Sequence, residues 1–225
     1  MFKTETHLHT SEISPCGKIS AKEMVKRYHE AGYKTICITD HVKQSYFDDM
    51  GDIPWKEKVS IILWGYYKAK CAAKKYNMNV IMSAELLLEG TAPNHYLIYG
   101  ISKKFLLKYP DFCKMGIEEF SKIARENGVF IVQAHPYRDG NNFPTPEYVD
   151  AFEVYNSNAR HVDYSERSLK TARENHLYIS AGSDAHREED VALSGILTDK
   201  EIKTAKDLVD AIKSDKTKLI GNEVL

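Results

Sequence analysis

Short apolar runs recur along this chain of 225 residues, and stretches with the periodicity of amphipathic helices lie between them. Strands that are apolar throughout are typical of a parallel sheet buried on both faces. About seven strand–helix units in one domain favour a closed or nearly closed barrel over an open Rossmann sheet. The glycine-rich phosphate loop that a Rossmann sheet carries after its first strand is also missing. The alternation therefore predicts an α/β fold of the barrel type, similar to a TIM barrel.

The positions of the elements follow from β-rich composition and from helix-capping signals. Ser20, with Glu23 three positions later, predicts the start of a first helix, and Gly32 predicts its end. Strands are expected at residues 2–7, 35–39, 80–83, 96–99, 129–132, 151–155 and 177–180, with a weaker one at 195–197. Further helices are expected at residues 54–76, 117–127, 163–175 and 204–213.

Length and charge limit the classes of protein to which the chain can belong. A chain of 225 residues suffices for one domain with a full core and is short for two, so a single domain over residues 1–225 is expected. The net charge of −1 provides no broad positive field for long nucleic acid or anionic lipid. No apolar run reaches the roughly 18 residues of a membrane helix, and the first residues lack the apolar core of a signal peptide. The four cysteines form no C-x-x-C pair and are expected to be reduced, which predicts a cytoplasmic protein.

Side chains that can bind metals follow the ends of five predicted strands. Residues two apart on a strand face the same way, so the H-x-H pair that ends the first strand can bind one ion. In a parallel barrel the carboxyl ends of the strands meet at one face, where active sites are built. The residues expected to converge there are His7, His9, His41, Glu85, His135, Asp184 and His186. Taken singly, Asp40 and Asp184 are as typical of helix caps as of ligands, but five converging groups have no low-cost explanation without a cation.

The mixture of ligand types indicates which ions the site prefers. Imidazole and carboxylate without thiolate suit zinc, manganese or iron rather than calcium. The set is larger than one tetrahedral ion needs, so at least two ions are expected, with Glu85 as a bridging carboxylate. Such a cluster lowers the pKa of a bound water and neutralises charge on the attacking and leaving oxygens of a phosphoester. The sequence therefore favours a metal-dependent phosphoester hydrolase.

Taken in order, these motifs resemble those of the PHP family, named for polymerase and histidinol phosphatase. The resemblance covers essentially the whole chain. Its motifs are the H-x-H of His7 and His9, the T-D-H of residues 39–41, the strand-end Glu85, the H-P of His135 and Pro136, and the S-D-A-H of residues 183–186. It implies a distorted (β/α)7 barrel and up to three zinc, manganese or iron ions. It also implies hydrolysis by a hydroxide that bridges two ions, without a covalent enzyme intermediate.

The resemblance further implies a division of the ligands among two to three divalent ions. One ion would be held by His7, His9, Glu85 and Asp184. A second would be held in part by His41 and His186, and a third by Glu85, His95 and His135. The residues expected to take catalytic roles are Asp184, His186 and His41.

The chain departs from the family pattern at two places. Family members commonly place an Asp or His a few residues after H-x-H as a further ligand. Here Glu12 is expected to substitute, with Cys16 as the second choice. His95 precedes its strand, which in an all-parallel sheet would put it away from the barrel mouth. Because the family carries a histidine at this distance after its glutamate, His95 is still expected to be a ligand.

Cationic residues just beyond strand ends are candidates for binding a substrate phosphate, because Arg grips phosphate bidentately and Lys acts as a point charge. These candidates are Arg138, Arg160, Arg187 and Lys43. Tyr137, Asn156 and His161 are candidates for lining the same pocket.

The expected function is that of a small phosphoesterase acting on a phosphomonoester of low molecular weight or on a short nucleotide. The near-neutral charge argues against long nucleic acid. Two other classes stay open. One is an amidohydrolase, whose barrel also begins with H-x-H and ends with a strand-terminal Asp; Glu85 and His186 fit the PHP pattern better. The other is a metal-stabilised domain that binds a partner without catalysis.

Overall fold

The computed structural model describes residues 1–91, 93–138, 142–162, 164–214 and 216–221. Within these ranges ten strands belong to one sheet. They are β1 (Phe2–Leu8), β2 (Tyr33–Ile38), β3 (His41–Lys43), β4 (Asn79–Leu87), β5 (Tyr96–Tyr99), β6 (Phe130–Gln133), β7 (Ala151–Asn156), β8 (Tyr178–Gly182), β9 (Gly195–Thr198) and β10 (Lys218–Ile220). The helices are α1 (Ala21–Glu30), α2 (Gln44–Asp49), α3 (Trp55–Ile62), α4 (Trp64–Ala73), α5 (Lys103–Lys108), α6 (Ile117–Glu126), α7 (Ser165–Glu174) and α8 (Ala205–Ile212). Single 3-10 turns lie at Lys74–Tyr76, Phe112–Lys114, Pro146–Tyr148 and Glu188–Asp190.

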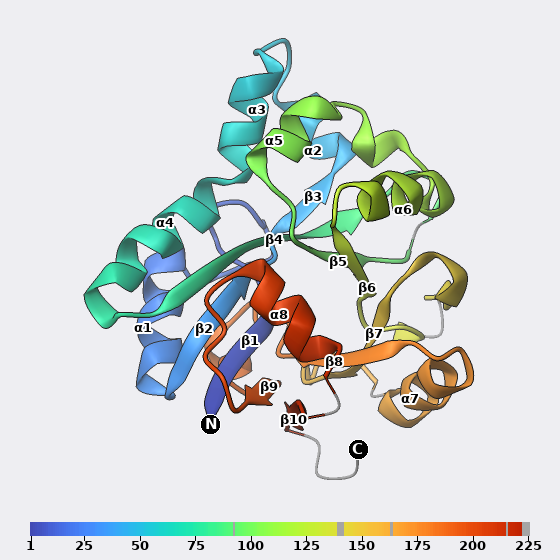
Figure 1. The fold of residues 1–225 in the computed structure, drawn as a ribbon. Coiled ribbons are helices and arrows are strands. Elements are labelled where there is room, and N and C mark those ends of the chain that lie inside the picture. The colour runs from blue at the N-terminus through green and yellow to red at the C-terminus, as the bar shows by residue number, and fades with distance from the viewer. Residues whose placement is uncertain (92, 139–141, 163, 215, 222–225) are drawn as a thin grey trace.

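The sheet curls until its two parallel halves almost meet. Its order is β10–β9–β1–β2–β4–β5–β6–β7–β8, and β3 pairs with β4. β1, β2 and β4 pair in parallel, as do β6, β7 and β8. A parallel bridge joins Leu8, at the end of β1, to Ala185, just beyond β8. The predicted α/β barrel is thus confirmed as a nearly closed, barrel-like sheet with helices around it (Figure 1).

The prediction of an all-parallel sheet is wrong at β5 and β9. β5 pairs antiparallel with both β4 and β6, and β9 pairs antiparallel with β1 and β10. Residues 88–95, which connect β4 to β5, are too few for the crossover of a dozen or more residues that parallel neighbours need. An apolar run does not reveal strand direction, so the sequence pattern missed this. The amino end of β5 consequently lies beside the carboxyl ends of β4 and β6.

Buried side chains on opposite faces of the strands belong to separate clusters. On β2, Cys37 packs in a cluster that includes Leu208 and Ile212 of α8. The neighbouring Ile36 and Ile38 pack instead in a cluster with residues of α1 and α4. Each fully buried aliphatic side chain of this size contributes roughly 1.5–3 kcal/mol of transfer free energy. Burial on both faces explains why the strands are apolar throughout.

Most predicted helices are present, with one divided. The side chain of Ser20 caps α1 by accepting a hydrogen bond from the Glu23 N–H, as predicted. The helix expected at 54–76 is instead α3 and α4, separated at Leu63. This break lets α3 pack beside α5 while α4 packs against α1. Asp163, the expected start of another helix, lies outside the described residues, and α7 begins at Ser165.

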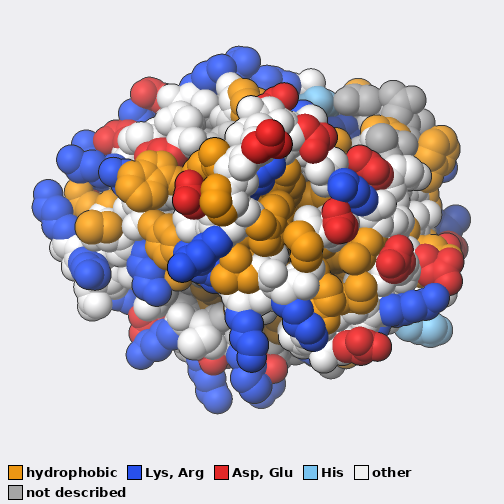
Figure 2. Space-filling view, turned by 90° about the horizontal axis from the view of Figure 1, so that it is seen from above, with side chains coloured by type: hydrophobic (Ala, Val, Ile, Leu, Met, Phe, Trp, Pro, Cys, Tyr) orange, Lys and Arg blue, Asp and Glu red, His pale blue; other side chains and the backbone are white. Residues whose placement is uncertain are grey.

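Two surface properties bear on possible partners. Among the described residues, no helix is both long enough and apolar enough to cross a membrane. Figure 2 shows one face of the molecule, on which Lys and Arg side chains alternate with Asp and Glu around a central hydrophobic group. That face therefore carries no field of a single sign.

Candidate metal centre

Four buried side chains from separate parts of the sheet converge on one point. His7 and His9 lie at the end of β1, Glu85 lies in β4 and Asp184 follows β8. The Nε2 atom of His7 is 3.1 Å from Nε2 of His9 and 3.3 Å from Oδ1 of Asp184. The Nε2 atom of His9 is 3.2 Å from the same Asp184 oxygen and 3.4 Å from Oε2 of Glu85. Ligands bound at 2.0–2.1 Å to a tetrahedral ion are about 3.3 Å apart, so these atoms have the spacing of one coordination shell.

Hydrogen bonding within this group is incomplete. The Oε2 atom of Glu85 is buried and has no hydrogen-bond partner among the described residues, although it lies 2.7 Å from Nδ1 of His41. The facing Nε2 atoms of His7 and His9 need opposite donor and acceptor roles to form a bond. Unsatisfied buried acceptors are costly. A divalent cation between them would remove that cost, so the residues present fit the metal that the family pattern implies.

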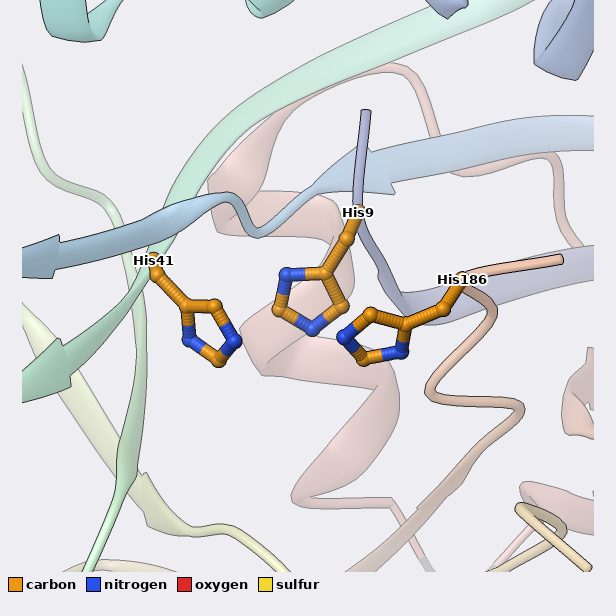
Figure 3. Close-up of side chains that lie close together, drawn as sticks. All are labelled: His9, His41 and His186. Atoms are coloured by element: carbon orange, nitrogen blue, oxygen red, sulfur yellow. The ribbon is translucent and has the colours of Figure 1, made fainter. Parts of the chain in front are cut away.

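A second group of imidazoles lies beside the first. His9, His41 and His186 point toward one another from β1, β3 and the segment after β8 (Figure 3). One ring nitrogen from each lies within 4.8 Å of the others. The His9 ring is stacked on that of His186 with centroids 4.2 Å apart, and the His9 and His41 centroids are 4.3 Å apart. The three rings can therefore share a second ion.

A third group surrounds the other side of Glu85. The Oε1 atom of Glu85 is 2.9 Å from Nδ1 of His95 and 3.1 Å from Nε2 of His135. His95 immediately precedes β5, and the antiparallel direction of that strand brings it to the mouth of the barrel. The expectation that a residue before its strand would lie far from the mouth is therefore wrong. Glu85 contacts histidines of all three groups, which suits it to bridging ions.

The structure does not bring Glu12 into these groups. Its Oε2 atom accepts a hydrogen bond from the N–H of Ala21, at the first turn of α1, so the carboxylate faces the helix rather than the barrel mouth. Cys16 lies at the mouth instead and lines the same pocket as His41 and His186. Burial would raise the pKa of the Cys16 thiol, but its hydrogen bonds to His186 and His41 lower it to about 6. The order in which the sequence ranked Glu12 and Cys16 is reversed by this geometry.

Asp40 shapes the loop that carries Cys16 and does not join the converging groups. Its carboxylate accepts hydrogen bonds from the N–H and the hydroxyl of Thr10, at 2.6 and 2.7 Å, and from the hydroxyl of Ser14 at 2.8 Å. Burial raises the pKa of Asp40 to about 6. A Cβ atom at Gly65 in α4 would lie 2.3 Å from Asp40 Oδ2, so this approach of helix to loop needs glycine.

Glu153 is a residue of the site that the sequence analysis missed. It lies in β7, is 1% exposed, and its Oε1 atom is 2.8 Å from Nδ1 of His7. Its Oε2 atom accepts hydrogen bonds from the N–H of His135 and the amide of Asn156. A carboxylate that holds the outer nitrogen of a histidine fixes the ring with its other nitrogen toward the metal. The sequence did contain a signal for this role, because Glu153 is an acidic residue inside the otherwise apolar run 151–155.

Replacing Glu153 with Gln is expected to weaken binding of the most tightly held zinc ion by about 10- to 100-fold, because His7 loses its charged orienting partner. The change keeps side-chain size, so the free energy of unfolding of the metal-free protein should change much less than metal affinity. Competition with a chromophoric chelator measures the affinity. Glu174→Gln, on the exposed face of α7, is the matched control and should bind zinc as the unmodified protein does. Equal affinities for both variants would show that Glu153 does not orient His7.

A second buried acid supports the ends of β1 and β8. Glu5 accepts hydrogen bonds from the N–H groups of Thr6, His7 and Ser183, and from the hydroxyls of Ser183 and Tyr28. Burial raises the pKa of Glu5 to about 7, against the lowering effect of these donors. Glu5 thus ties the backbone of His7 to the residue that precedes Asp184.

Backbone conformation is unusual at two candidate ligands. His135 has φ of 31° and Asp184 has φ of 50°, in the left-handed region that non-glycine residues seldom adopt. Such conformations cost of the order of 1–3 kcal/mol and occur where surrounding structure imposes them, often at functional sites. Both residues follow the carboxyl end of a strand, where this turn directs their side chains into the cluster.

The candidate ligand groups open into a pocket of about 400 Å³ lined by three of the four predicted phosphate-binding cations. Arg138 donates to Oδ2 of Asp184 at 2.7 Å, and Arg160 makes a bidentate pair with Asp190 at 2.6 and 2.8 Å. Arg187 has a half-exposed side chain 3.8 Å from a carboxylate oxygen of Glu189. Lys43 is not among the lining residues, and its Nζ atom lies 4.8 Å from the ring centroid of Tyr46.

Only some of the other residues expected to line the pocket lie at or beside it. His161 lines the pocket, and Asn156 accepts a hydrogen bond from Arg138 beside it. The hydroxyl of Tyr137 instead contacts that of Thr171 on α7, at 2.7 Å. Asn158, which the sequence did not single out, lines the pocket and donates to Asp184 at 3.3 Å.

Protonation in the metal-free chain differs sharply among the histidines. Burial would lower the pKa of His7, but Glu153, Asp184 and Glu85 raise it well above its usual value. The pKa of His41 is raised to about 10, mainly by Glu85, although burial alone would lower it. Burial lowers the pKa of His9 well below its usual value, and burial with Arg138 lowers that of His135 to about 4. Without metal at neutral pH, His7 and His41 therefore carry protons, whereas His9 and His135 are ready to bind a cation.

Zinc binding to the metal-free protein at pH 7 is expected to release about two protons, because His7 and His41 must be neutral to act as ligands. Both groups have raised pKa values, so the apparent zinc affinity should rise with pH through neutrality and fall on acidification. Titration in dilute buffer with a pH indicator counts the protons. Binding without proton release at pH 7 would show that these imidazoles are not ligands.

Comparison with known proteins decides the family. The family model described as the PHP domain matches residues 5–214. This chain belongs to the PHP domain family. No curated protein is similar enough to this PHP chain to count as a match.

Several solved structures share the fold of this PHP chain. One is a two-domain protein from Bacteroides vulgatus that contains a predicted PHP-like metal-dependent phosphoesterase, with TM-score 0.72 and 16% identity. The alignment covers 100% of this chain and 66% of that protein, so the chain spans less than two thirds of its length. PsfC from Pseudomonas syringae has TM-score 0.68 and 15% identity over 99% of this chain and 92% of its own. An amidohydrolase from Chromobacterium violaceum with bound sulfate has TM-score 0.57 and 14% identity over 84% and 89%. At these identities the likeness concerns the fold alone.

Proposed function

We propose that this PHP-family chain is a metal-dependent phosphoesterase that hydrolyses a small phosphomonoester or a short nucleotide. The observation that carries the proposal is the convergence of His7, His9, Glu85 and Asp184, in which the two histidine Nε2 atoms lie 3.1–3.5 Å from each other and from carboxylate oxygens of Glu85 and Asp184. Two further groups adjoin it through His9 and Glu85. The proposal includes two to three zinc, manganese or iron ions, a single PHP domain over residues 1–225 and a cytoplasmic location.

Ions held in these groups would supply a water acidic enough to act as nucleophile at neutral pH, and would offset charge on the phosphoryl group. The chain's own residues do the positioning. Glu85 and Asp184 bring negative charge that favours cations, and Glu153 fixes the ring of His7. His41 and His186 line the pocket beside the cluster, where they can contact a phosphoryl oxygen.

The pocket supports a small anionic substrate. A volume of about 400 Å³ lies within the range of sites for small molecules. Arg187 is the least engaged of its arginines, because Arg138 and Arg160 already pair with Asp184 and Asp190 at 2.8 Å or less. A substrate phosphate can therefore recruit Arg187 by displacing only its long, 3.8 Å ion pair with the exposed Glu189. The net charge of −1 weighs against long nucleic acid as substrate.

The test is a substrate screen on protein reconstituted separately with zinc, manganese and iron(II). The panel contains an aryl phosphate, sugar phosphates, nucleoside monophosphates, a dinucleotide, long single-stranded DNA, and an amide and lactone set. We expect phosphate release from small phosphoesters that disappears on chelation and returns when metal is restored. Turnover of amides or lactones alone would replace the proposal with an amidohydrolase. Metal binding without turnover of any compound would favour a binding domain.

A further inference from the structure

Cys16 lies at the barrel mouth beside His41 and His186, two of the histidines that line the pocket. The loop from β1 to α1 carries it, β3 begins with His41, and His186 follows β8. Its thiol is hydrogen-bonded to the imidazoles of both His186 and His41. The same three side chains line one wall of the pocket. A sulfur atom therefore adjoins two of the three imidazoles of the second group.

Backbone contacts hold the Cys16 loop to both histidine-bearing segments. The N–H of Lys18 donates to the carbonyl of His186 at 2.7 Å. On the other side, the N–H of His41 donates to the hydroxyl of Ser14 at 3.1 Å. Gly17 lies so close to Thr10 that a Cβ atom there would be 2.9 Å from its carbonyl carbon and oxygen, so the loop is tightly folded. Cys16 is thus placed by the fold between His41 and His186.

We propose that Cys16 is a thiolate ligand of the second metal ion, together with His41 and His186. The inference rests on the proposed function only in requiring that the cluster holds a transition metal. The thiolate form binds the metal, and any proton still on the sulfur passes to solvent. Glu12, the oxygen ligand that the sequence favoured here, is occupied at the start of α1.

A sulfur ligand changes which ion this position prefers. Thiolate is a soft ligand that suits zinc and iron(II) more than manganese, whose preferred ligands are carboxylate, carbonyl and water. The first and third groups contain only imidazole and carboxylate. The second position is therefore expected to select zinc, cobalt or cadmium over manganese, whereas the others select less sharply.

The test uses cobalt(II) in place of the native ions, because a cobalt–thiolate bond produces an intense near-ultraviolet charge-transfer band. Metal-free full-length protein is titrated anaerobically with cobalt(II). We expect the band in the unmodified protein and in Cys71→Ser, which removes a free exposed cysteine on α4. In Cys16→Ser the band should vanish while the visible bands of cobalt at the remaining groups persist. Absence of the band from the unmodified protein, or its persistence in Cys16→Ser, overturns the proposal.

Thiol modification provides a second test of metal binding by Cys16, and this test needs no variant. Cys16 and Cys71 are the exposed cysteines, and both should react with iodoacetamide in metal-free protein. Saturation with zinc should slow alkylation of Cys16 at least 10-fold and leave that of Cys71 unchanged, as followed by peptide mass spectrometry. Unchanged alkylation of Cys16 counts against ligation. Because neither reading uses catalysis, a chain that shows the cobalt–sulfur band but hydrolyses no phosphoester would refute the proposed function and keep this inference.

Discussion

Glu85→Gln is expected to reduce kcat/KM for an aryl phosphate by on the order of 10³-fold or more. Its carboxylate oxygens lie 2.7–3.5 Å from ring nitrogens of histidines in all three groups, including His41, His95 and His135. Loss of this charge removes several kcal/mol of metal-dependent charge stabilisation, at about 1.4 kcal/mol for each factor of ten. Steady-state kinetics at saturating zinc measure the effect, and elemental analysis of the same samples should find at least one ion fewer per chain.

The control for Glu85→Gln is Glu119→Gln, which removes an equal charge from the exposed face of α6. Its activity and metal content should equal those of the unmodified protein. A Glu85→Gln protein that kept its full metal content and turnover would remove Glu85 from the site.

Asp184→Asn is expected to lower turnover by a similar factor, but with a different metal content. Its Oδ1 atom faces His7 and His9, whereas its Oδ2 atom accepts hydrogen bonds from Arg138 and Asn158. Asp184 therefore belongs to the first group and does not contact the third, which Glu85 forms with His95 and His135. We expect this variant to lose one ion and to keep the third position.

Comparing Asp184→Asn with Glu85→Gln separates bridging from simple ligation. If Glu85 bridges two ions, its variant should bind fewer ions than the Asp184 variant when both are titrated with zinc under identical conditions. Equal stoichiometry in both variants would contradict the bridging role. The unfolding transition of each metal-free variant, measured in urea, shows whether lost binding reflects lost structure.

The sequence predicted the barrel and the convergence of its strand ends because both depend on local signals. An apolar run buried on both faces has a continuous pattern, and a His or acid directly after such a run lies at its carboxyl end whatever its neighbours are. His135 and Asp184 obey this rule after β6 and β8, whereas His7 and Glu85 lie within the last three residues of β1 and β4. The break between α3 and α4 has no such signal, since Leu63 continues the apolar pattern while the two helices pack in different clusters.

Strand direction and loop path are not local, and there the sequence interpretation failed. His95 reaches the mouth because β5 runs antiparallel to its neighbours, which depends on the short connection from β4. Glu12 and Cys16 lie in one loop and can both bind metals, and only the hydrogen bonds of that loop to Asp40 and α1 decide which of them faces the pocket. Glu153 lies in the middle of β7, and the sequence pattern assigns a residue at such a position to the packed core rather than to an active site.

The most direct test of the clustered-ion account is anomalous diffraction at the zinc edge, from crystals grown with zinc. The account predicts a strong peak within roughly 2.0–2.2 Å of His7, His9, Glu85 and Asp184, and at least one further peak beside His41 and His186 or beside His95 and His135. A map without density between His7, His9, Glu85 and Asp184, from protein that hydrolyses phosphoesters in the same zinc solution, would contradict it.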